Sequence, residues 1–454
     1  MTTAAEFSAR LCGPISSAPV WTDETASLNR GDLHSEVDRC QRSLASAGVA
    51  AGDCVGLQIQ PCVTLMALLL AVWRLDAKAM LLDYRLTETE TSRLTRLCRP
   101  GFLVRCPARI AHFSSRCDPD IQRLDNPVSV PDFASLVQFT SGSTGQSKVV
   151  ARSADSLDQE VDRYAATDDM PGADDRLLLL CSPVHTWGLI GGVLHGLAHN
   201  THVLFPEPAG TAARAAQRLD ATAIFGVPTH FEILASMSRS PRLPSLRSAT
   251  SAGAVTDGKV SEAFHRVYSC PLGQVYGLTE VGVVTADIVG RYPPPAVGRP
   301  VPGMTVRVTG GELYIKLPDS PYLVDDGANR FADGWLRTFD RALQEDSGVI
   351  SILGRSDSLI AIGGTKIDLM EIEEMLGEHP AVVRAVVTFG DVIEAHIATQ
   401  AHLSSVELTQ WCRGRLNPMK IPKRFFIKDQ LPLTPTGKVI RDRAQLLPED
   451  RQQG

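Results

Sequence analysis

The sequence lacks most of the features that would place it outside the ordinary class of globular proteins. It contains ten cysteines but no CxxC pair, and no His/Cys group has the spacing of a zinc site. This excludes the common zinc and dithiol redox motifs and favours reduced, mostly buried thiols in a cytoplasmic protein. Lys and Arg form no dense run, and the formal net charge is −6. A nucleic-acid partner is therefore not expected.

Long apolar segments are also missing. The longest run, residues 63–73, ends at Arg74, whereas a helix that crosses a bilayer needs about 20 apolar residues. No cationic segment followed by an apolar stretch and a cleavage site is visible at the start, so neither a secretory signal nor a membrane partner is expected. A chain of 454 residues with 44% apolar and 21% charged residues predicts a soluble globular protein of two or three domains.

Short apolar runs alternate with amphipathic stretches through most of the chain, which is typical of parallel strands covered by helices. After Gly290 the segments become short and are separated by Gly, Asp and Pro, which predicts an antiparallel or barrel-like subdomain. Helices are expected at residues 32–47 and 63–74, and strands at 54–58, 79–82, 136–139, 176–181, 201–205, 223–225, 273–275, 305–308, 312–315, 334–338 and 349–353. The predicted fold class is α/β, with a large N-terminal domain at residues 1–356.

The C-terminal part of the chain predicts a separate, small and mobile α+β domain at residues 357–454. Its expected helices lie at residues 367–376 and 405–416, and its expected strands at 382–388 and 393–398.

A run of small hydroxylated residues and glycines, TSGSTGQSK at 140–148, follows an apolar strand and ends on a lysine. Backbone N–H groups in such a loop form a concave anion site, and Lys148 adds a full positive charge. Phosphate is the expected guest, although the stretch is not a Walker A loop because no Ser or Thr follows the lysine. A flexible surface turn is the alternative. The candidate residues are Thr140, Ser141, Gly142, Ser143, Thr144, Gly145 and Lys148.

A second candidate stretch, QVYGLTE at 274–280, also follows an apolar strand. Tyr276 offers a ring that can stack on a base, Gly277 permits close approach, and Thr279 and Glu280 add a hydroxyl and a carboxylate. This combination suits a nucleotide with bound Mg²⁺. The alternative is a strand end followed by a polar turn.

Three more stretches follow in order: TFD at 338–340, GRSD at 354–357 and LPLTPTGK at 431–438. Taken together, and beginning at the LNRGDL segment at 28–33, these motifs resemble the superfamily of adenylate-forming enzymes. That superfamily includes acyl- and aryl-CoA ligases, adenylation domains of nonribosomal peptide synthetases, and luciferases. The resemblance covers nearly the whole chain, and five motifs in the same order make coincidence negligible.

The resemblance implies an enzyme that activates a carboxylic acid with ATP and Mg²⁺, giving an acyl-adenylate and pyrophosphate. The acyl group is then passed to the thiol of CoA or of a carrier-protein phosphopantetheine. Because the attack on the α-phosphate concentrates negative charge, positive charge and N–H donors must surround it. The implied partners are thus a small carboxylic acid and either CoA or an acyl carrier protein.

The resemblance also assigns nucleotide-binding roles to single residues. Tyr276 lies against adenine, Thr279 contacts the phosphate, and Glu280 holds the metal ion. Asp340 holds the ribose hydroxyls, since a carboxylate can accept two hydroxyl protons, and Arg355 is directed to ribose or phosphate. In the SAGA turn at 251–254, the backbone that touches adenine includes Gly253 and Ala254.

Lys438, in PTGK, matches the lysine that reaches from the small domain to the reacting carboxylate and the α-phosphate. The alternative is an ordinary solvated lysine. Asp357 matches the hinge about which the small domain rotates, and Gly363 and Gly364 match a glycine loop beside the pantetheine tunnel. The predicted catalytic residues are Lys438, Thr279, Glu280 and Lys148.

The pocket for the acid is predicted around CSPVHTWGL at 181–189, which resembles the histidine-plus-aromatic pattern of acyl- and aryl-acid ligases. This segment has no carboxylate for an α-amino group, so an aromatic or related non-amino acid is favoured. Core packing and a structural histidine are the alternatives. The candidate pocket residues are His185, Trp187, Phe225, Gly226, Ser251 and Val281.

The chain departs from the family pattern at three points: Phe339 replaces a glycine, Ala361 stands where many relatives have a lysine of the second half-reaction, and the large domain is short. One alternative is therefore adenylation of an acid, or of a small oxyanion such as nitrite, followed by transfer to an amine. A second is a non-catalytic nucleotide-binding relative. The favoured hypothesis is a stand-alone cytoplasmic acid–thiol ligase, AMP-forming, of secondary metabolism.

Overall fold

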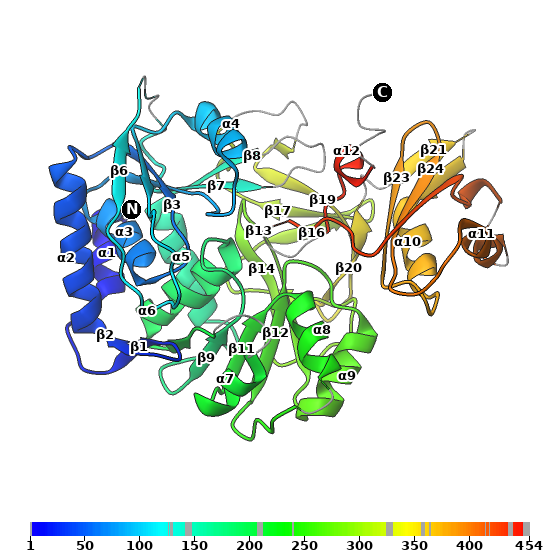
Figure 1. The fold of residues 1–454 in the computed structure, drawn as a ribbon, viewed down its shortest axis with the longest axis horizontal. Helices are drawn as coiled ribbons and strands as arrows, with labels where there is room; N and C mark the ends of the chain where they lie inside the picture. Colours follow the sequence, from blue (N-terminus) through cyan, green and yellow to red (C-terminus); the bar gives the residue numbers. More distant parts are fainter. Residues whose placement is uncertain are drawn as a thin grey trace.

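The structure, a computed structural model, shows a mixed α/β protein (Figure 1). It describes residues 2–125, 127, 130–140, 148–206, 212–237, 240–323, 330–355, 359–362, 365–413, 415–416, 418–434 and 439–447, without the side chains of residues 89, 140, 359, 361, 362, 365, 366 and 368. Among these residues no helix is both long and apolar enough to cross a membrane.

The first sheet of the large domain has the strand order β6-β5-β3-β4-β7-β8. Its strands are β3 (Cys54–Gln58), β4 (Lys78–Leu81), β5 (Phe102–Arg105), β6 (Asp120–Arg123), β7 (Leu136–Thr140) and β8 (Lys148–Arg152). Neighbours are parallel in the interior, and the two edge pairs, β5 with β6 and β7 with β8, are antiparallel. The loop predicted to bind phosphate therefore connects two hydrogen-bonded strands.

Helices packed on this sheet explain the longest apolar run. α3 (Val63–Arg74) is buried at every residue except Arg74, as expected for a helix that is apolar all round. α1 (Ala4–Cys12) and the amphipathic α2 (Arg30–Ser46) pack against it. Asn29 and Asp32 form a capping box at the start of α2, within the LNRGDL segment.

The second sheet has the order β15-β14-β13-β12-β11-β9-β10-β1-β2, and β10, β9, β11, β12 and β13 run parallel. Its strands are β1 (Pro19–Thr22), β2 (Ser27–Asn29), β9 (Arg176–Leu179), β10 (His202–Leu204), β11 (Ala223–Gly226), β12 (Ser248–Ala252), β13 (Leu272–Leu278), β14 (Gly282–Asp287) and β15 (Arg299–Pro300). α4 (Glu88–Cys98) packs on the first sheet, where Leu94 and Cys98 share a buried cluster with residues of β3, β4 and β5. The other helices of the large domain are α5 (Ala154–Ala165), a π-helix (Trp187–Leu194), α6 (His195–His199), α7 (Ala212–Arg218), α8 (Pro228–Ser236) and α9 (Gly258–Tyr268).

The third sheet is the predicted antiparallel subdomain, with the order β16-β17-β19-β18 and β20 paired to β19. Its strands are β16 (Val306–Thr309), β17 (Glu312–Lys316), β18 (Phe331–Ala332), β19 (Trp335–Gln344) and β20 (Ile350–Arg355). β19 is longer than predicted and carries irregular pairing with β17 and β20, so it curves across the subdomain.

The small domain contains the hairpin β21 (Leu359–Ile362) with β22 (Thr365–Asp368), and a sheet of the order β23-β24-β25. In Figure 1 these elements lie at one side of the molecule, beyond β20. The other elements are α10 (Leu369–Gly377), β23 (Arg384–Phe389), β24 (Ile393–Ala398), α11 (Ser405–Arg413), a 3₁₀ turn (Pro418–Lys420), β25 (Arg424–Lys428) and α12 (Arg443–Leu446).

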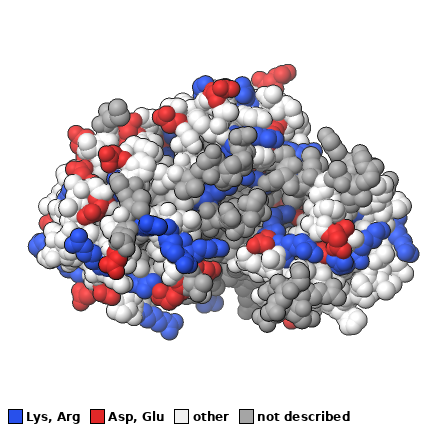
Figure 2. Space-filling view, turned by 90° about the horizontal axis from the view of Figure 1, so that it is seen from above, with Lys and Arg blue, Asp and Glu red and all other residues white. Residues whose placement is uncertain are grey.

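The predicted α/β class, the antiparallel subdomain and the small α+β domain are confirmed. Several predicted boundaries differ by a few residues. The helix expected at residues 367–376, for example, begins at Leu369, because Ile367 pairs with Ile360 in the hairpin. Figure 2 shows acidic and basic side chains mixed among the described residues of the face seen from above.

Candidate functional site

The end of β13 carries the second predicted motif. Tyr276 and Gly277 are in the strand, and Thr279 and Glu280 follow it directly. A Cβ on Gly277 would lie 2.5 Å from the carbonyl oxygen of Gly282 on β14, so the glycine is required by the neighbouring strand. The close approach predicted at this position is thus made by the protein's own backbone.

The predicted ribose residues come together with the predicted adenine residue. The Tyr276 hydroxyl donates to Oδ2 of Asp340 at 2.5 Å, and Nη1 of Arg355 lies 3.2 Å from Oδ1 of the same carboxylate. Asp340 and Arg355 are register partners on β19 and β20. Burial, with the Asp340 charge beside it, raises the pKa of Tyr276 far above the ordinary value, so the hydroxyl stays protonated and is a donor.

Phe339 occupies a bulge of β19 with φ +63°, a conformation that favours glycine. Its ring lies between two guanidinium groups, with the carbon atoms of Arg330 and Arg337 at 4.4 Å and 4.2 Å from the ring centre. Asp340 is buried and contacts Tyr276 instead. The Phe339 ring, at the position of the family's glycine, therefore packs with arginines. The hydrogen bond between Tyr276 and Asp340 is present beside it.

Lys148 and Glu280, predicted for the phosphates and the metal ion, lie on either side of one tyrosine. The Tyr322 hydroxyl donates to Oε1 of Glu280 at 2.8 Å, and Nζ of Lys148 lies 5.6 Å from the centre of the Tyr322 ring. Lys148 is the first residue of β8 and is buried, while Glu280 lies in the turn between β13 and β14 of the other large sheet. Two residues that are 132 positions apart (280 − 148) in the sequence thus contact the same side chain, that of Tyr322.

Other predicted nucleotide residues lie outside the described part of the chain. Ser141, Gly142, Ser143, Thr144 and Gly145 are among them, and of Thr140 only the backbone, paired with Lys148, is described.

Gly253 and Ala254 follow β12 and are exposed. Gly253 has φ +91°, which explains why a glycine stands in this turn. Ser251, in β12, is fully buried, and its hydroxyl has no hydrogen-bond partner among the described residues.

The aromatic residues predicted for the acid pocket are in contact. The rings of Trp187 and Phe225 stack with centres 4.5 Å apart. Trp187 begins the π-helix, and a Cβ on Gly191 would lie 2.6 Å from its ring, so the glycine makes room for the indole. Gly226 pairs in register with Ser251 at the adjacent strand end. These four predicted residues therefore surround the carboxyl ends of β11 and β12, where parallel α/β sheets bind ligands.

Val281 belongs to a different cluster of buried residues. It packs with Val284, Ile315 and Leu336, whereas Trp187 and Phe225 belong to the main core.

His185 has a partner that the sequence did not indicate. Its Nε2 lies 3.6 Å from Oδ2 of Asp83, a buried carboxylate just after β4. Arg85 donates to both oxygens of Asp83 at 3.0 Å and 2.8 Å. Burial alone would raise the pKa of Asp83, but His185 and Arg85 hold it well below its usual range. A carboxylate compensated by Arg85 therefore lies near the histidine, whose Nε2 has no hydrogen-bond partner among the described residues.

Lys438, Asp357, Gly363 and Gly364 lie outside the described residues. The chain on either side of Lys438 is anchored: Leu433 bridges Val439, and the Ile440 amide donates to the Pro432 carbonyl at 2.9 Å.

Two ion pairs continue this anchoring. Arg441 makes a bidentate pair with Glu373 of α10, at 2.7 Å and 2.6 Å, and Arg443 does the same with the buried Glu394 of β24, at 2.6 Å and 2.9 Å.

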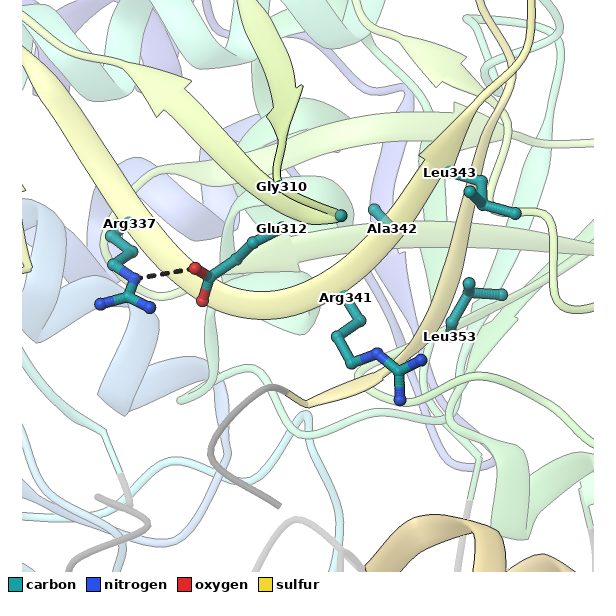
Figure 3. Close-up of a pocket in the computed structure, with 8 residues that line it drawn as sticks. Gly310, Glu312, Arg337, Arg341, Ala342, Leu343 and Leu353 are labelled. Carbon is teal, nitrogen blue, oxygen red and sulfur yellow. Dashed lines mark hydrogen bonds and ion pairs between the residues drawn. The ribbon is translucent and has the colours of Figure 1, made fainter. Parts of the chain in front are cut away.

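A cavity of about 470 Å³ lies against the bend of β19. Figure 3 shows Arg337 paired with Glu312, Arg341 further along the curve of β19, and Leu353 on the neighbouring strand β20. None of the described residues that the sequence predicts for the site lines this cavity. Its lining residues are Gly310, Gly311, Glu312, Arg337, Arg341, Ala342, Leu343 and Leu353.

The fold and these residues define a two-domain α/β enzyme, and sequence comparison gives its family. The AMP-binding enzyme model matches residues 13–318, and the model of the AMP-binding enzyme C-terminal domain matches residues 371–438. The chain therefore belongs to the AMP-binding enzymes of the adenylate-forming superfamily.

Curated relatives are similar over most of their length. The chain is 27% identical to an indoleacetate–CoA ligase of Aromatoleum aromaticum, covering 91% of this chain and 92% of the relative. It is 26% identical to a 4-chlorobenzoate–CoA ligase of Arthrobacter sp., covering 91% and 89%.

Solved structures share the fold. The O-succinylbenzoate coenzyme A synthetase of Bacillus subtilis in complex with AMP is similar with a TM-score of 0.81 at 22% identity, covering 96% of this chain and 97% of that one. An anthranilate CoA ligase in complex with anthranoyl-AMP gives 0.79 at 19% identity, covering 96% and 95%.

Proposed function

We propose that the protein activates an aromatic or related non-amino carboxylic acid with ATP, forming an acyl-adenylate, and transfers the acyl group to the thiol of CoA or a phosphopantetheine. The observation that carries this proposal is the convergence of Lys148 and Glu280 on Tyr322, together with that of Tyr276 and Arg355 on Asp340. Family membership and the CoA ligases among the relatives support it.

Each group has a chemical role in the proposed adenylation. The ammonium of Lys148 offsets charge on the triphosphate, and the Asp340 carboxylate accepts hydrogen bonds from the ribose hydroxyls. Lys438 brings a second positive charge to the reacting carboxylate and α-phosphate. Charge placed in advance where negative charge develops lowers the barrier without reorganisation of solvent.

Glu280 fits the requirement of Mg²⁺. No cluster of three or more His, Cys, Asp or Glu side chains suited to a metal is present in the part of the chain that the structure describes. Mg²⁺ in nucleotide sites is held by one or two carboxylates together with the phosphates, so a single glutamate is sufficient. The ion would neutralise phosphate charge.

The acid is proposed to be uncharged beyond its carboxylate. Asp83 brings a negative charge near His185, but Arg85 already compensates it. The stacked Trp187 and Phe225 favour an aromatic ring.

A cytoplasmic location is part of the proposal. All ten cysteines are described and none is in a disulfide. Burial raises the pKa of both Cys40 and Cys54 to about 12, so these thiols are unreactive.

The test is ATP–pyrophosphate exchange with a panel of acids that includes indoleacetate, 4-chlorobenzoate, anthranilate and amino acids. Exchange that depends on an aromatic acid supports the proposal, and no exchange with any acid contradicts it. Mass analysis after addition of CoA, a loaded carrier protein or amines then identifies the acceptor. An amide as the sole product would favour the alternative transfer to an amine.

A further inference from the structure

Tyr322 contacts both Lys148, predicted to bind the phosphates, and Glu280, predicted to hold the metal ion. Its hydroxyl donates to Oε1 of Glu280 at 2.8 Å, and its ring lies under the Lys148 ammonium, with 5.6 Å between Nζ and the ring centre. The two interactions use different parts of the side chain. They can therefore be removed one at a time.

The backbone fixes this tyrosine relative to Lys148. Residues 321–323 run antiparallel to β8: the Leu323 amide donates to the Val149 carbonyl at 3.0 Å, and the Ala151 amide donates to the Pro321 carbonyl at 3.0 Å. Tyr322 itself forms an antiparallel bridge with Val150. The strand that carries Lys148 thus also sets the position of the tyrosine ring, which then reaches across to the other large sheet at Glu280.

A carboxylate held by one hydroxyl has a defined orientation. When the Tyr322 hydroxyl donates to Oε1 of Glu280, rotation of the carboxylate is restricted, and groups that orient a ligating carboxylate tune its affinity for the metal. A ring face beneath an ammonium likewise limits where the cation rests. Both effects act on residues that are proposed to bind the same triphosphate.

We propose that Tyr322 is a positioning residue for Mg·ATP: its hydroxyl orients the Glu280 carboxylate for Mg²⁺, and its ring holds the Lys148 ammonium beside the phosphates. The inference rests on the proposed function, because it assumes that both residues bind nucleotide. It concerns nucleotide binding and is independent of which acid or thiol is used.

The third sheet offers a matched control. Tyr314, on β17, has its hydroxyl 3.4 Å from Oε2 of Glu312 and its ring 5.2 Å from the guanidinium carbon of Arg307. Tyr314→Phe therefore removes a tyrosine–glutamate contact that lies beside a cation, as Tyr322→Phe does. The residues around Tyr314, Glu312 and Arg307, are not predicted to bind nucleotide.

The experiment is calorimetric titration of ATP into the full-length protein, once with excess Mg²⁺ and once with EDTA. For Tyr322→Phe we expect the gain in ATP affinity that Mg²⁺ provides to fall roughly tenfold, while affinity in EDTA stays within about twofold. For Tyr322→Leu, which also loses the ring, affinity in EDTA falls as well, by roughly threefold. Tyr314→Phe changes neither.

A double-mutant cycle with Glu280→Gln isolates the hydroxyl. In that background Tyr322→Phe should add no further loss of the Mg²⁺ effect, and thermal unfolding of each variant confirms folding. An unchanged or increased Mg²⁺ effect in Tyr322→Phe, or a loss equal to that of Tyr314→Phe, overturns the inference. If the wild-type protein binds no Mg·ATP, the proposed function fails together with the inference, and this result is distinguishable because it precedes any variant.

Discussion

The surroundings of the two predicted catalytic lysines are held together in different ways. Lys148 is part of a buried strand, and side chains from two sheets meet beside it, with Tyr322 between Lys148 and Glu280. The segments that flank Lys438 are held by a backbone bridge and by ion pairs from Arg441 and Arg443.

The difference teaches how one enzyme can combine a fixed and a delivered charge. In the large domain the proposed phosphate site includes the buried Lys148, so its geometry depends on packing between sheets. In the small domain the anchors are local: Arg441 and Arg443 pair with Glu373 and Glu394 of the same domain. Segments that are anchored within one domain can move with it as a unit, as the proposed hinge motion requires.

The largest effect on ATP–pyrophosphate exchange is expected from Lys438, the charge that the small domain is proposed to deliver. Lys438→Ala should reduce ATP–pyrophosphate exchange by roughly 10²- to 10³-fold, because charge aimed at the transition state is lost, while ATP affinity stays nearly unchanged. Lys420→Ala, which removes a surface partner of Glu371, is the control. Undiminished exchange in Lys438→Ala would show that the assignment is wrong.

Weakening the Glu373–Arg441 pair, which holds the segment after Lys438, should reduce exchange less than loss of Lys438 does. Glu373 is buried and accepts from Arg441 and from the Val387 amide at 2.7 Å. Glu373→Gln weakens the pair with Arg441, so we expect about 2 kcal/mol less stability and roughly tenfold slower exchange at unchanged ATP affinity.

Glu371→Gln is the matched control for this anchor. Glu371 also lies on α10 and pairs with a lysine, Lys420, but at the surface, where such pairs contribute about 0–1 kcal/mol. Equal losses in Glu371→Gln and Glu373→Gln would remove the special role of the Arg441 anchor.

The Asp83 carboxylate provides a pH-dependent test of the contacts around His185, in the predicted pocket for the acid substrate. Its pKa is lower in the folded protein than the unfolded value of about 3.9. Its contribution to stability is therefore present above about pH 4 and is lost as the pH falls through the folded pKa.

Asp83→Asn should lower the melting temperature at pH 7, and the difference from wild type should shrink on acidification. Thermal unfolding from pH 7 to pH 3 measures this difference. A gap that stays constant over that range would contradict the assigned pairing with Arg85 and His185.

The smallest effect is expected at Phe339. Phe339→Gly relieves a positive φ that costs about 1 kcal/mol, but it loses the contacts with Arg330 and Arg337. We expect little net change in stability and an ATP affinity within about twofold of wild type, because the ring packs with Arg330 and Arg337. A tenfold change in ATP affinity would place the ring at the ribose site.

Much of the fold could be predicted because local patterns decide it. The all-round apolar residues of α3 and the alternation of apolar strands with helices are visible in the sequence, and the elements lie where these patterns place them. The sequence placed Ile367 in a helix, because an apolar residue just before a helix fits the helical and the strand periodicity equally well. Its pairing with Ile360, which places it in the hairpin, is a contact that the periodicity does not contain.

The missed site residues depend on tertiary contacts. Tyr322 follows no recognisable signal, since its role arises from a backbone bridge to Val150. Asp83 stands just after a buried strand, which is a weak indication of a site, but its partner His185 is 102 positions away (185 − 83). Motifs predict which residues meet a ligand, whereas residues that orient them are set by packing.

The most direct measurement of the central claim is a crystal structure of the protein grown with Mn²⁺ and ATP. The account predicts an anomalous peak for the metal beside the Glu280 carboxylate, with the triphosphate between Glu280 and Lys148 and the ribose at Asp340. A nucleotide bound elsewhere, such as in the cavity beside Arg337 and Arg341, with Lys148 and Glu280 still joined only through Tyr322, would contradict it.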